Sequence, residues 1–178
     1  STKGGVGKTT LAAAFAVCAA EEGKRVALVD LDPQESLAWW WGLRGQPDNP
    51  TVYSGESSAK SAIEKLANVE APDWVILDGP PGFLDSVAEM VDAATLVVIP
   101  TKTGMIDILG SEGAVATARK YGAPFLIVLN DVHTNDGTDI SAKQFMHDNA
   151  LPLAEAVIPH RVAHIRAMSA GKTAAEVD

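Results

Sequence analysis

The sequence predicts an α/β fold in which a mostly parallel β-sheet carries helices on both faces, making three layers. Short, nearly continuous apolar runs rich in β-branched residues alternate with longer segments of helical periodicity. Such runs are typical of strands buried on both faces of a parallel sheet, because the crossover helices cover both sides. A glycine-rich turn that leads into the first helical segment favours the same class of fold.

Five apolar runs are predicted as strands because each is short and rich in β-branched side chains. They are residues 25–29, 74–77, 95–99, 124–129 and 154–158. The segment 44–54 is rich in Gly, Pro and Asn and is predicted as a loop, and 135–137 as a turn.

Seven segments between these runs are predicted as helices from their apolar periodicity. They are residues 9–22, 34–43, 59–67, 84–91, 108–121, 141–149 and 162–170. In the first of them, Leu11, Phe15 and Cys18 fall on one face, which predicts that this face packs and that Cys18 is a buried thiol. Trp39, Trp40 and Trp41 cannot all face one side of a helix, so we expect one or two in the core and at least one exposed or at an interface.

Composition narrows the function classes. The chain of 178 residues suggests a single domain, residues 1–178, without repeats or linkers. Its net charge of −9 argues against a uniformly basic nucleic-acid binder, although a local basic patch stays open. Cys18 is the only cysteine, which excludes an intrachain disulfide and a cysteine-held cluster and fits a reducing cytoplasm. No apolar run reaches the length of a membrane span, and no secretory signal is recognised.

A phosphate-binding loop opens the chain. It reads Lys3, Gly4, Gly5, Val6, Gly7, Lys8, Thr9, Thr10. Three glycines let the backbone turn its N–H groups around an anion, and the following helix adds its positive dipole end. Lys8 can reach the β- and γ-phosphates, and the Thr9 hydroxyl is placed to bind Mg²⁺. The loop therefore predicts ATP and Mg²⁺ as cofactors.

Two features of the loop are unusual. The general pattern begins with glycine where this chain has Thr2, and Lys3 adds a second lysine, which could serve a second nucleotide or the transition state. Such a loop normally follows a buried strand, yet Ser1 lies two residues before it. We therefore expect that the first strand is missing from the given sequence and that both ends are trimmed.

Carboxylates follow two predicted strands. Asp30 and Asp32 come after one apolar run, and Asp78 ends another. The carboxyl ends of parallel strands face the ligand crevice, where acids hold Mg²⁺ or orient water. Asp32, which precedes Pro33, could alternatively cap the next helix.

These motifs together resemble the ParA/MinD family of P-loop ATPases with a deviant Walker A motif. The matching segments are residues 3–10, 30–34, 74–81, 97–100, 128–130 and 157–159. The Asp-Pro-Gln form of residues 32–34 is closest to the small ParA-type partition ATPases, and the resemblance implies a P-loop NTPase fold over nearly the whole chain.

The resemblance implies a role for each loop lysine and each acid. Lys3 would reach across an ATP-sandwich homodimer to the partner's phosphates, while Lys8 would bind the phosphates of its own chain. Thr9 would ligate Mg²⁺, Asp78 would hold it through water, and Asp32 would polarise the attacking water and sense Mg²⁺ or γ-phosphate.

Base contacts and partners are implied as well. Asn130 and the loop at Pro159 would contact adenine, although Asp131 stands where the family often has Arg. The family implies slow ATP hydrolysis that a separately encoded ParB-like or cargo-adaptor protein stimulates. It also implies non-specific DNA binding in the ATP state, on the bacterial nucleoid, to segregate plasmid, chromosome or protein cargo.

The stretch 156–175 contains no acid and carries five basic or titratable residues. They are Arg161, Arg166 and Lys172, with His160 and His164. The three cations could form a phosphate-backbone patch for DNA, or they could lie on an ordinary solvated helix face. The two histidines, spaced i, i+4, could pair on a metal, but a solvated or phosphate-facing role is favoured because no carboxylate or cysteine accompanies them.

Other function classes remain as alternatives. A MinD-like membrane-cycling regulator would need a C-terminal basic amphipathic helix, which is not seen before Asp178. An iron–sulfur relative would need more than Cys18. A tyrosine kinase would need more tyrosines than Tyr53 and Tyr121, and a small-molecule P-loop enzyme would not need Lys3.

Overall fold

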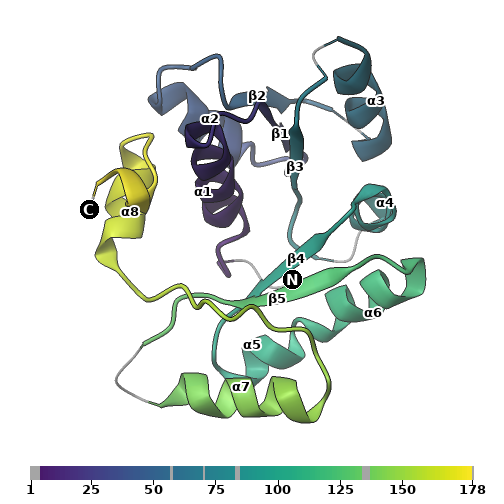
Figure 1. The fold of residues 1–178 in the computed structure, drawn as a ribbon, viewed down its shortest axis with the longest axis vertical. Helices are drawn as coiled ribbons and strands as arrows, with labels where there is room; N and C mark the ends of the chain where they lie inside the picture. Colours follow the sequence, from purple (N-terminus) through teal and green to yellow (C-terminus); the bar gives the residue numbers. More distant parts are fainter. Residues whose placement is uncertain (1–4, 57, 70, 83–84, 134–136, 178) are drawn as a thin grey trace. The chain divides into compact units, whose positions relative to one another are not determined.

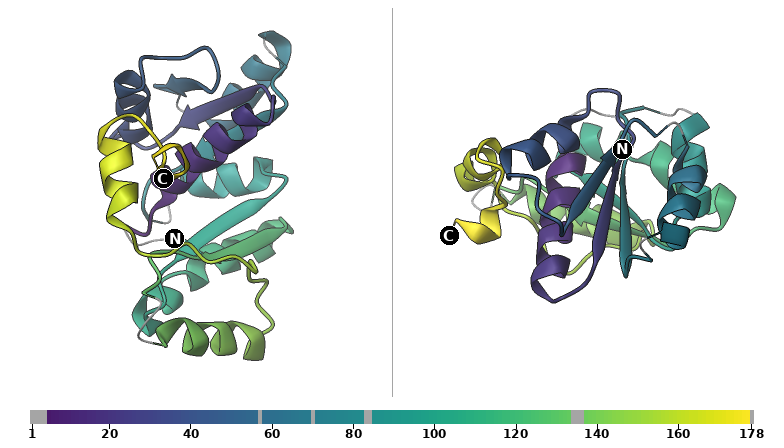
Figure 2. Two further views of the ribbon diagram at one scale, coloured as in Figure 1. Left: turned by 60° about the vertical axis from the view of Figure 1, so that its left-hand side comes forward. Right: turned by 90° about the horizontal axis from the view of Figure 1, so that it is seen from above.

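The computed structural model describes residues 5–56, 58–69, 71–82, 85–133 and 137–177. The chain divides into two compact units (Figures 1 and 2). The α1 unit comprises Lys8–Pro80 and Val162–Asp178, and the β4 unit comprises Ser1–Gly7 and Pro81–Arg161.

The α1 unit is built on a three-stranded parallel sheet of order β2-β1-β3. Its strands are β1 (Val26–Asp30), β2 (Thr51–Ser54) and β3 (Trp74–Asp78). All five residues of β1 are buried, because this central strand is paired on both edges and covered on both faces. That burial explains why its sequence is continuously apolar rather than alternating.

Helices cover both faces of this sheet. They are α1 (Lys8–Glu21), α2 (Ser36–Leu43), α3 (Ala59–Val69) and α8 (Val162–Ser169), followed by the 3₁₀ turn η1 (Ala174–Glu176). Leu28 of β1 packs with α1 and α2, whereas its neighbours Ala27 and Val29 pack with α3. The alternation of side chains along β1 thus produces the three predicted layers within this unit.

The packing face of α1 differs from the prediction. The helix buries mainly small residues against the sheet, among them Ala13, Ala16 and Val17. Phe15, with 41% of its surface exposed, and Cys18 are exposed, so the prediction of a buried thiol was wrong. Alanines let a helix approach a sheet closely, and they turn the bulkier Phe15 outward.

The tryptophan run behaves as predicted. Trp40 is 1% exposed and Trp39 is 64% exposed. Trp41 is half-buried against the same core, and its indole N–H donates to the carbonyl of Pro47 at 3.3 Å.

The C-terminal segment of the α1 unit docks on α2. Arg44, which follows α2, holds Glu176 of η1 through two nitrogen–oxygen contacts of 2.9 and 2.8 Å. Burial acts to raise the pKa of Glu176, but hydrogen bonds from Arg44 and Thr173 outweigh it and lower that pKa. Gly171 lies so close to the end of α2 that an added Cβ would sit 2.4 Å from the backbone nitrogen of Arg44.

The β4 unit contains a two-stranded parallel sheet, β4 (Val97–Thr101) and β5 (Phe125–Leu129). Its helices are α4 (Asp85–Ala93), α5 (Met105–Leu109), α6 (Glu112–Tyr121) and α7 (Thr138–Asp148). Ile99 and Ile127 of the two strands pack in one core with residues of α5, α6 and α7. The predicted helix 108–121 is divided at Gly110 and Ser111, where the Ser111 hydroxyl donates to the carbonyl of Ile108 at 2.6 Å.

Two strand assignments need correction. The segment predicted as a loop, 44–54, contains β2, a short edge strand of the α1 unit. The predicted strand 154–158 instead runs along β5 through isolated bridges, Ile127 to Leu153 and Val132 to Pro159. The Ala154 N–H donates to the carbonyl of Ile127 and the Ile158 N–H to that of Leu129, and the pairing with β5 is interrupted between them, at 155–157.

The predicted class of fold is confirmed, because parallel strands flanked by helices make up both units. None of the helices in the described ranges combines the length and apolar character that crossing a bilayer requires.

Candidate nucleotide-binding site

The phosphate loop has a backbone that only glycine readily adopts. Gly5 has φ 77° and Gly7 has φ 90°, both in the left-handed region. At Gly7 an added Cβ would also lie 2.2 Å from the side-chain nitrogen of Asn130. Lys3 and Gly4 lie outside the described residues, so their predicted roles stay predictions.

Asn130 supports this loop from the end of β5. Its side-chain nitrogen donates to the carbonyl of Val6 at 2.7 Å, and its backbone N–H donates to the carbonyl of Thr101 at 2.8 Å. Val6 is 1% exposed, so the loop is anchored at a buried residue. The predicted contact of Asn130 with adenine stays a prediction beside this loop-holding role.

The second segment predicted to contact adenine is fixed to the same region of the β4 unit. Pro159 forms a bridge with Val132, two residues beyond Asn130. The Val132 N–H donates to the carbonyl of Ile158 at 3.0 Å, and the His160 N–H donates to the carbonyl of Val132 at 2.8 Å. The two predicted adenine-contacting segments are therefore neighbours.

The loop continues into the α1 unit at Lys8, where α1 begins. The first turn of this helix contains no acidic side chain. Its N-terminal N–H groups and Lys8 therefore present positive charge without a local carboxylate on the helix to offset it. Such a helix terminus suits an anionic phosphate group.

Three carboxylates gather at the carboxyl ends of β1 and β3 in the α1 unit. Asp30 and Asp78 are register partners on the adjacent strands and are each 2% exposed. Asp32, two residues beyond β1, is half-buried. The three acids therefore lie together at the carboxyl end of this sheet.

Asp30 is a structural cap. One of its oxygens accepts hydrogen bonds from the backbone N–H groups of Leu37 at 2.9 Å and Ala38 at 3.0 Å, at the start of α2. The residue preceding that helix, Glu35, makes no capping bond of its own. Asp32, the capping candidate in the sequence, instead accepts from the Gln34 N–H at 3.0 Å within a turn. The capping role thus falls to Asp30, which lies farther from the helix in sequence.

The pKa of Asp78 is raised above its ordinary value. Burial, with the nearby charges of Asp30 and Asp32, raises the pKa of Asp78 to about 6, while a hydrogen bond from the Thr9 hydroxyl and the charge of Lys8 oppose the rise. Among the residues that the structure describes, none is a hydrogen-bond partner of the buried Oδ2 atom of Asp78. A buried acceptor in this condition is costly unless a ligand satisfies it.

These donors fit a magnesium ion. Mg²⁺ prefers oxygen ligands, and the Thr9 hydroxyl and Asp78 carboxylate already lie within hydrogen-bond reach of each other. A cation beside Asp78 would satisfy the unpartnered Oδ2 atom and offset the repulsion among the three acids. The carboxylates thus have the chemistry of a magnesium site, next to the helix terminus that suits phosphate.

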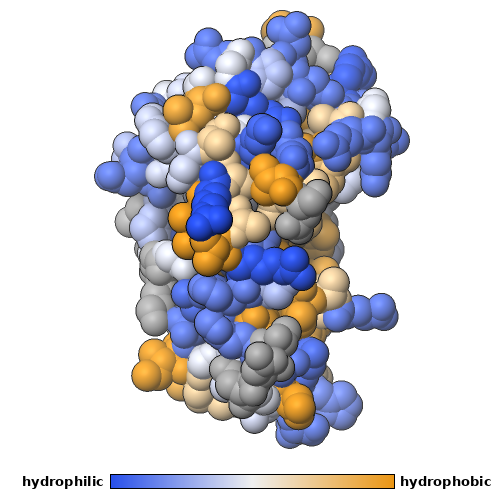
Figure 3. Space-filling model, turned by 90° about the vertical axis from the view of Figure 1, so that its left-hand side faces the viewer, coloured by the Kyte–Doolittle hydropathy of each residue, from blue (hydrophilic) through white to orange (hydrophobic). Residues whose placement is uncertain are grey.

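The basic stretch is divided between the two units. Arg161 is exposed in the β4 unit, and Arg166 and Lys172 are exposed in the α1 unit. On α8, Arg166 stands beside Ile165, which is 66% exposed, and Figure 3 shows hydrophobic side chains among hydrophilic ones on that side. His160 bonds to Asp131, so an acid from elsewhere in the chain lies against this stretch.

Sequence reasoning missed Asp30 as a cap and did not single out Lys102 or His133. A second acid two residues before Asp32, directly at the end of an apolar run, was a usable signal for Asp30. Lys102 and His133 gave none, because their partners Asp131 and His160 lie 27 or more residues away in sequence.

The family described as "CobQ/CobB/MinD/ParA nucleotide binding domain" matches residues 1–174. Maintenance of carboxysome distribution protein A of Gloeobacter kilaueensis is 35% identical over 173 residues, covering 95% of this chain and 78% of that protein. The chromosome-partitioning ATPase Soj of Thermus thermophilus is 30% identical over 210 residues, covering 98% and 84%.

A solved structure has the same fold. The septum site-determining protein MinD of Pyrococcus horikoshii, complexed with Mg-ADP, superposes with a TM-score of 0.73 at 20% identity. The match covers 99% of this chain and 85% of that one.

Proposed function

We propose that this chain, which belongs to the CobQ/CobB/MinD/ParA family of nucleotide-binding domains, is an ATPase that positions or partitions a cargo by switching between ATP and ADP states. The observation that carries the proposal is the Thr9–Asp78 pair, with its buried unpartnered oxygen, beside the phosphate loop. Relatives whose names describe carboxysome distribution and chromosome partitioning support positioning as the use of that switch.

Each residue of the site has a part in this proposal. Thr9, Asp78 and Asp32 would hold Mg²⁺, which neutralises phosphate charge when bound. Lys8 and the N–H groups at the start of α1 bind the phosphates. Asp32, only half-buried, orients the attacking water.

Lys3 completes the site in a homodimer. A second lysine within one phosphate loop exceeds what one bound nucleotide needs, and a partner subunit can stabilise the charge of the transferring phosphoryl group. Dimerisation then depends on ATP, and hydrolysis releases the dimer. Intrinsic hydrolysis is slow until a separate ParB-like or cargo-adaptor protein stimulates it.

In its ATP state, the proposed dimer binds DNA without sequence specificity. Arg161, Arg166 and Lys172 are exposed, and a dimer presents each of them twice. Phosphate contacts of this kind give affinity that falls steeply with salt. Pairing two weak surfaces in a dimer raises the avidity, so DNA binding follows the nucleotide state.

The test compares the wild type with Lys3→Ala and with Lys24→Ala, an exposed lysine outside the loop. Light scattering measures dimers with ATP or ADP, and a DNA-binding assay is run over a salt series. We expect ATP-dependent dimers that bind DNA in the wild type and in Lys24→Ala. Lys3→Ala should still bind ATP but stay monomeric.

Two results would contradict the proposal in different ways. If Lys3→Ala still formed ATP-dependent dimers, Lys3 would not be the residue that completes the site of the other subunit. Wild-type dimers that do not bind DNA at any salt concentration would contradict the proposed DNA binding. They would not contradict the proposed ATP-dependent dimerisation.

A further inference from the structure

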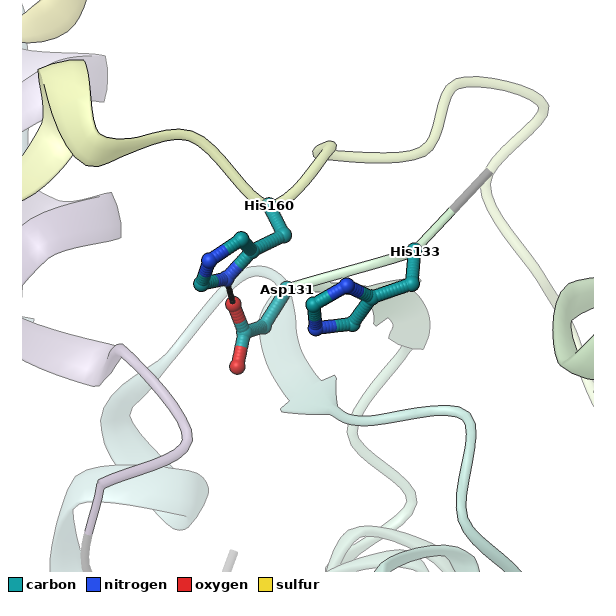
Figure 4. Close-up of side chains that lie close together, drawn as sticks. All are labelled: Asp131, His133 and His160. Carbon is teal, nitrogen blue, oxygen red and sulfur yellow. Dashed lines mark hydrogen bonds and ion pairs between the residues drawn. The ribbon is translucent and has the colours of Figure 1, made fainter. Parts of the chain in front are cut away.

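A cluster of three potential metal ligands lies in the β4 unit and shares no residue with the proposed magnesium site. Asp131 and His133 follow β5, and His160 comes from the segment that runs beside it (Figure 4). One ligand atom from each side chain lies within 4.8 Å of the others. A carboxylate and two imidazoles thus converge from two separate segments.

The backbone fixes this convergence. Val132, between Asp131 and His133, is 1% exposed and hydrogen-bonds on both sides of Pro159, to Ile158 and to His160. The buried Val132 therefore anchors both segments, and the flanking side chains remain near the surface. Asp131 has φ 61°, a left-handed conformation that Asp and Asn tolerate better than most residues.

The three side chains already interact with one another. The Nδ1 atom of His160 lies 2.5 Å from Oδ1 of Asp131, and the ring of His133 stacks on that of His160 with centroids 4.3 Å apart. Lys102 donates to the other Asp131 oxygen at 2.7 Å. Hydrogen bonds from Lys102 and His160 lower the pKa of Asp131, which keeps its carboxylate ionised.

We propose that Asp131, His133 and His160 form a binding site for a divalent transition-metal ion of the Zn²⁺, Co²⁺ or Ni²⁺ class. Imidazole nitrogens suit these ions, and two histidines with one carboxylate are a common ligand set for them. Mg²⁺ prefers oxygen ligands, so the ion of the nucleotide site is a poor competitor. The proposal does not depend on the proposed function.

The geometry needs only small side-chain movements. In a tetrahedral site with metal–ligand bonds of about 2.0–2.1 Å, ligand atoms lie about 3.3 Å apart. Rotation of the exposed His133 ring brings its nitrogen closer, and the metal takes the position of the proton between Asp131 and His160.

Lys102 and solvent complete the proposed site. Lys102 keeps hold of the second oxygen of Asp131 and so orients the carboxylate, as outer hydrogen-bond partners do in metal sites. Three protein ligands leave a position for water or a small anion. Because the ion displaces a proton, its binding weakens on acidification.

The experiment uses the full chain without nucleotide and Co²⁺ as the probe. Visible absorption reports nitrogen and oxygen coordination, and calorimetry with Zn²⁺ gives stoichiometry and affinity. We expect one ion per chain. His133→Ala and His160→Ala should each weaken binding by at least about 10-fold, and Asp131→Asn by about 10- to 100-fold.

The matched control is His147→Ala, an exposed histidine on α7 in the same unit. It should bind like the wild type, and circular dichroism should show that all four variants are folded. The proposal is overturned if the wild type gives no Co²⁺ absorption. It is equally overturned if His133→Ala and His160→Ala bind as tightly as His147→Ala.

Discussion

At the residue scale, the unpartnered Oδ2 atom of Asp78 connects stability to ligand binding. A buried carboxylate beside two other acids is unfavourable in the free protein, and a cation at that atom relieves the cost. The buried carboxylate of Asp78 therefore lowers the folding stability of the free protein, and a cation bound at Oδ2 would offset that loss.

Asp78→Asn tests whether the buried charge lowers folding stability and whether it is needed for stabilisation by a bound cation. The substitution removes the buried charge, so the nucleotide-free protein at pH 7.5 should gain on the order of 1–3 kcal/mol of unfolding free energy. Stabilisation by added Mg²⁺ and ATP should largely disappear. Urea unfolding followed by tryptophan fluorescence measures both. Asp48→Asn, an exposed acid of the same unit, should change neither, and a destabilised Asp78→Asn would contradict the account.

The pH dependence has a definite sign. The pKa of Asp78 is about 6 in the folded state and 3.8 in the reference state, so folding favours the protonated form between these values. Stability from this group falls as pH rises through that window, by at most about 3 kcal/mol, and is constant above it. Subtracting the unfolding free energy of Asp78→Asn from that of the wild type, pH by pH, isolates this effect from the other acids. A difference that stays flat between pH 4 and 6 would show that the pKa is not raised.

At the element scale, prediction succeeded where an element's own residues determine it. Continuous apolar runs gave β1 and β3, together with the acids that follow them. β2 was missed because a four-residue edge strand flanked by turn-forming residues has little apolar signal. Residues 154–158 have strand-like side chains, but their backbone hydrogen bonds to β5 stop at Ala154 and resume at Ile158.

The same distinction applies to the site: residues in local motifs could be predicted, whereas contacts between distant segments could not. Thr9 and Asp78 were found because motif and strand end are local features of the sequence. The clustering of Asp131, His133 and His160 was not, because it depends on a bridge between distant segments. The face of α1 was misjudged because alanine carries almost no signal in an apolar pattern, although it packs well.

Docking of the C-terminal segment on α2 gives a prediction at this scale. Gly171→Ala places a Cβ 2.5 Å from the Leu43 carbonyl carbon, on a backbone with φ 69°. We expect a loss of more than about 2 kcal/mol in unfolding free energy. Gly23 has φ 80° and open space where a Cβ would lie, so Gly23→Ala should lose only about 1 kcal/mol of unfolding free energy. Equal losses in urea unfolding would mean that the segment moves freely away from α2.

At the scale of the whole molecule, the family assignment and the fold are established, whereas the assignment of residues 1–178 to one domain stays a prediction. The net charge of −9 makes the proposed DNA contact a local property of exposed cations. It also implies repulsion between DNA and the rest of the surface, so the affinity of a monomer should be low.

Asp32→Ala should hold the molecule in its proposed ATP state. Without the carboxylate that we propose orients water, ATP should bind without being hydrolysed, so dimers should persist on DNA. Light scattering and a phosphate-release assay measure this, with Asp48→Ala as the control. An Asp32→Ala protein that stays monomeric with ATP, while still binding it, would give Asp32 a role in assembly instead of hydrolysis.

The outward-facing thiol of α1 has a practical consequence. Cys18 is the only cysteine of the chain and is exposed, on the helix that begins at Lys8. A maleimide dye would therefore attach at one known position in the unmutated protein. Energy transfer between donor- and acceptor-labelled chains could then follow subunit exchange of the proposed dimer in real time, with every native side chain except that thiol unchanged.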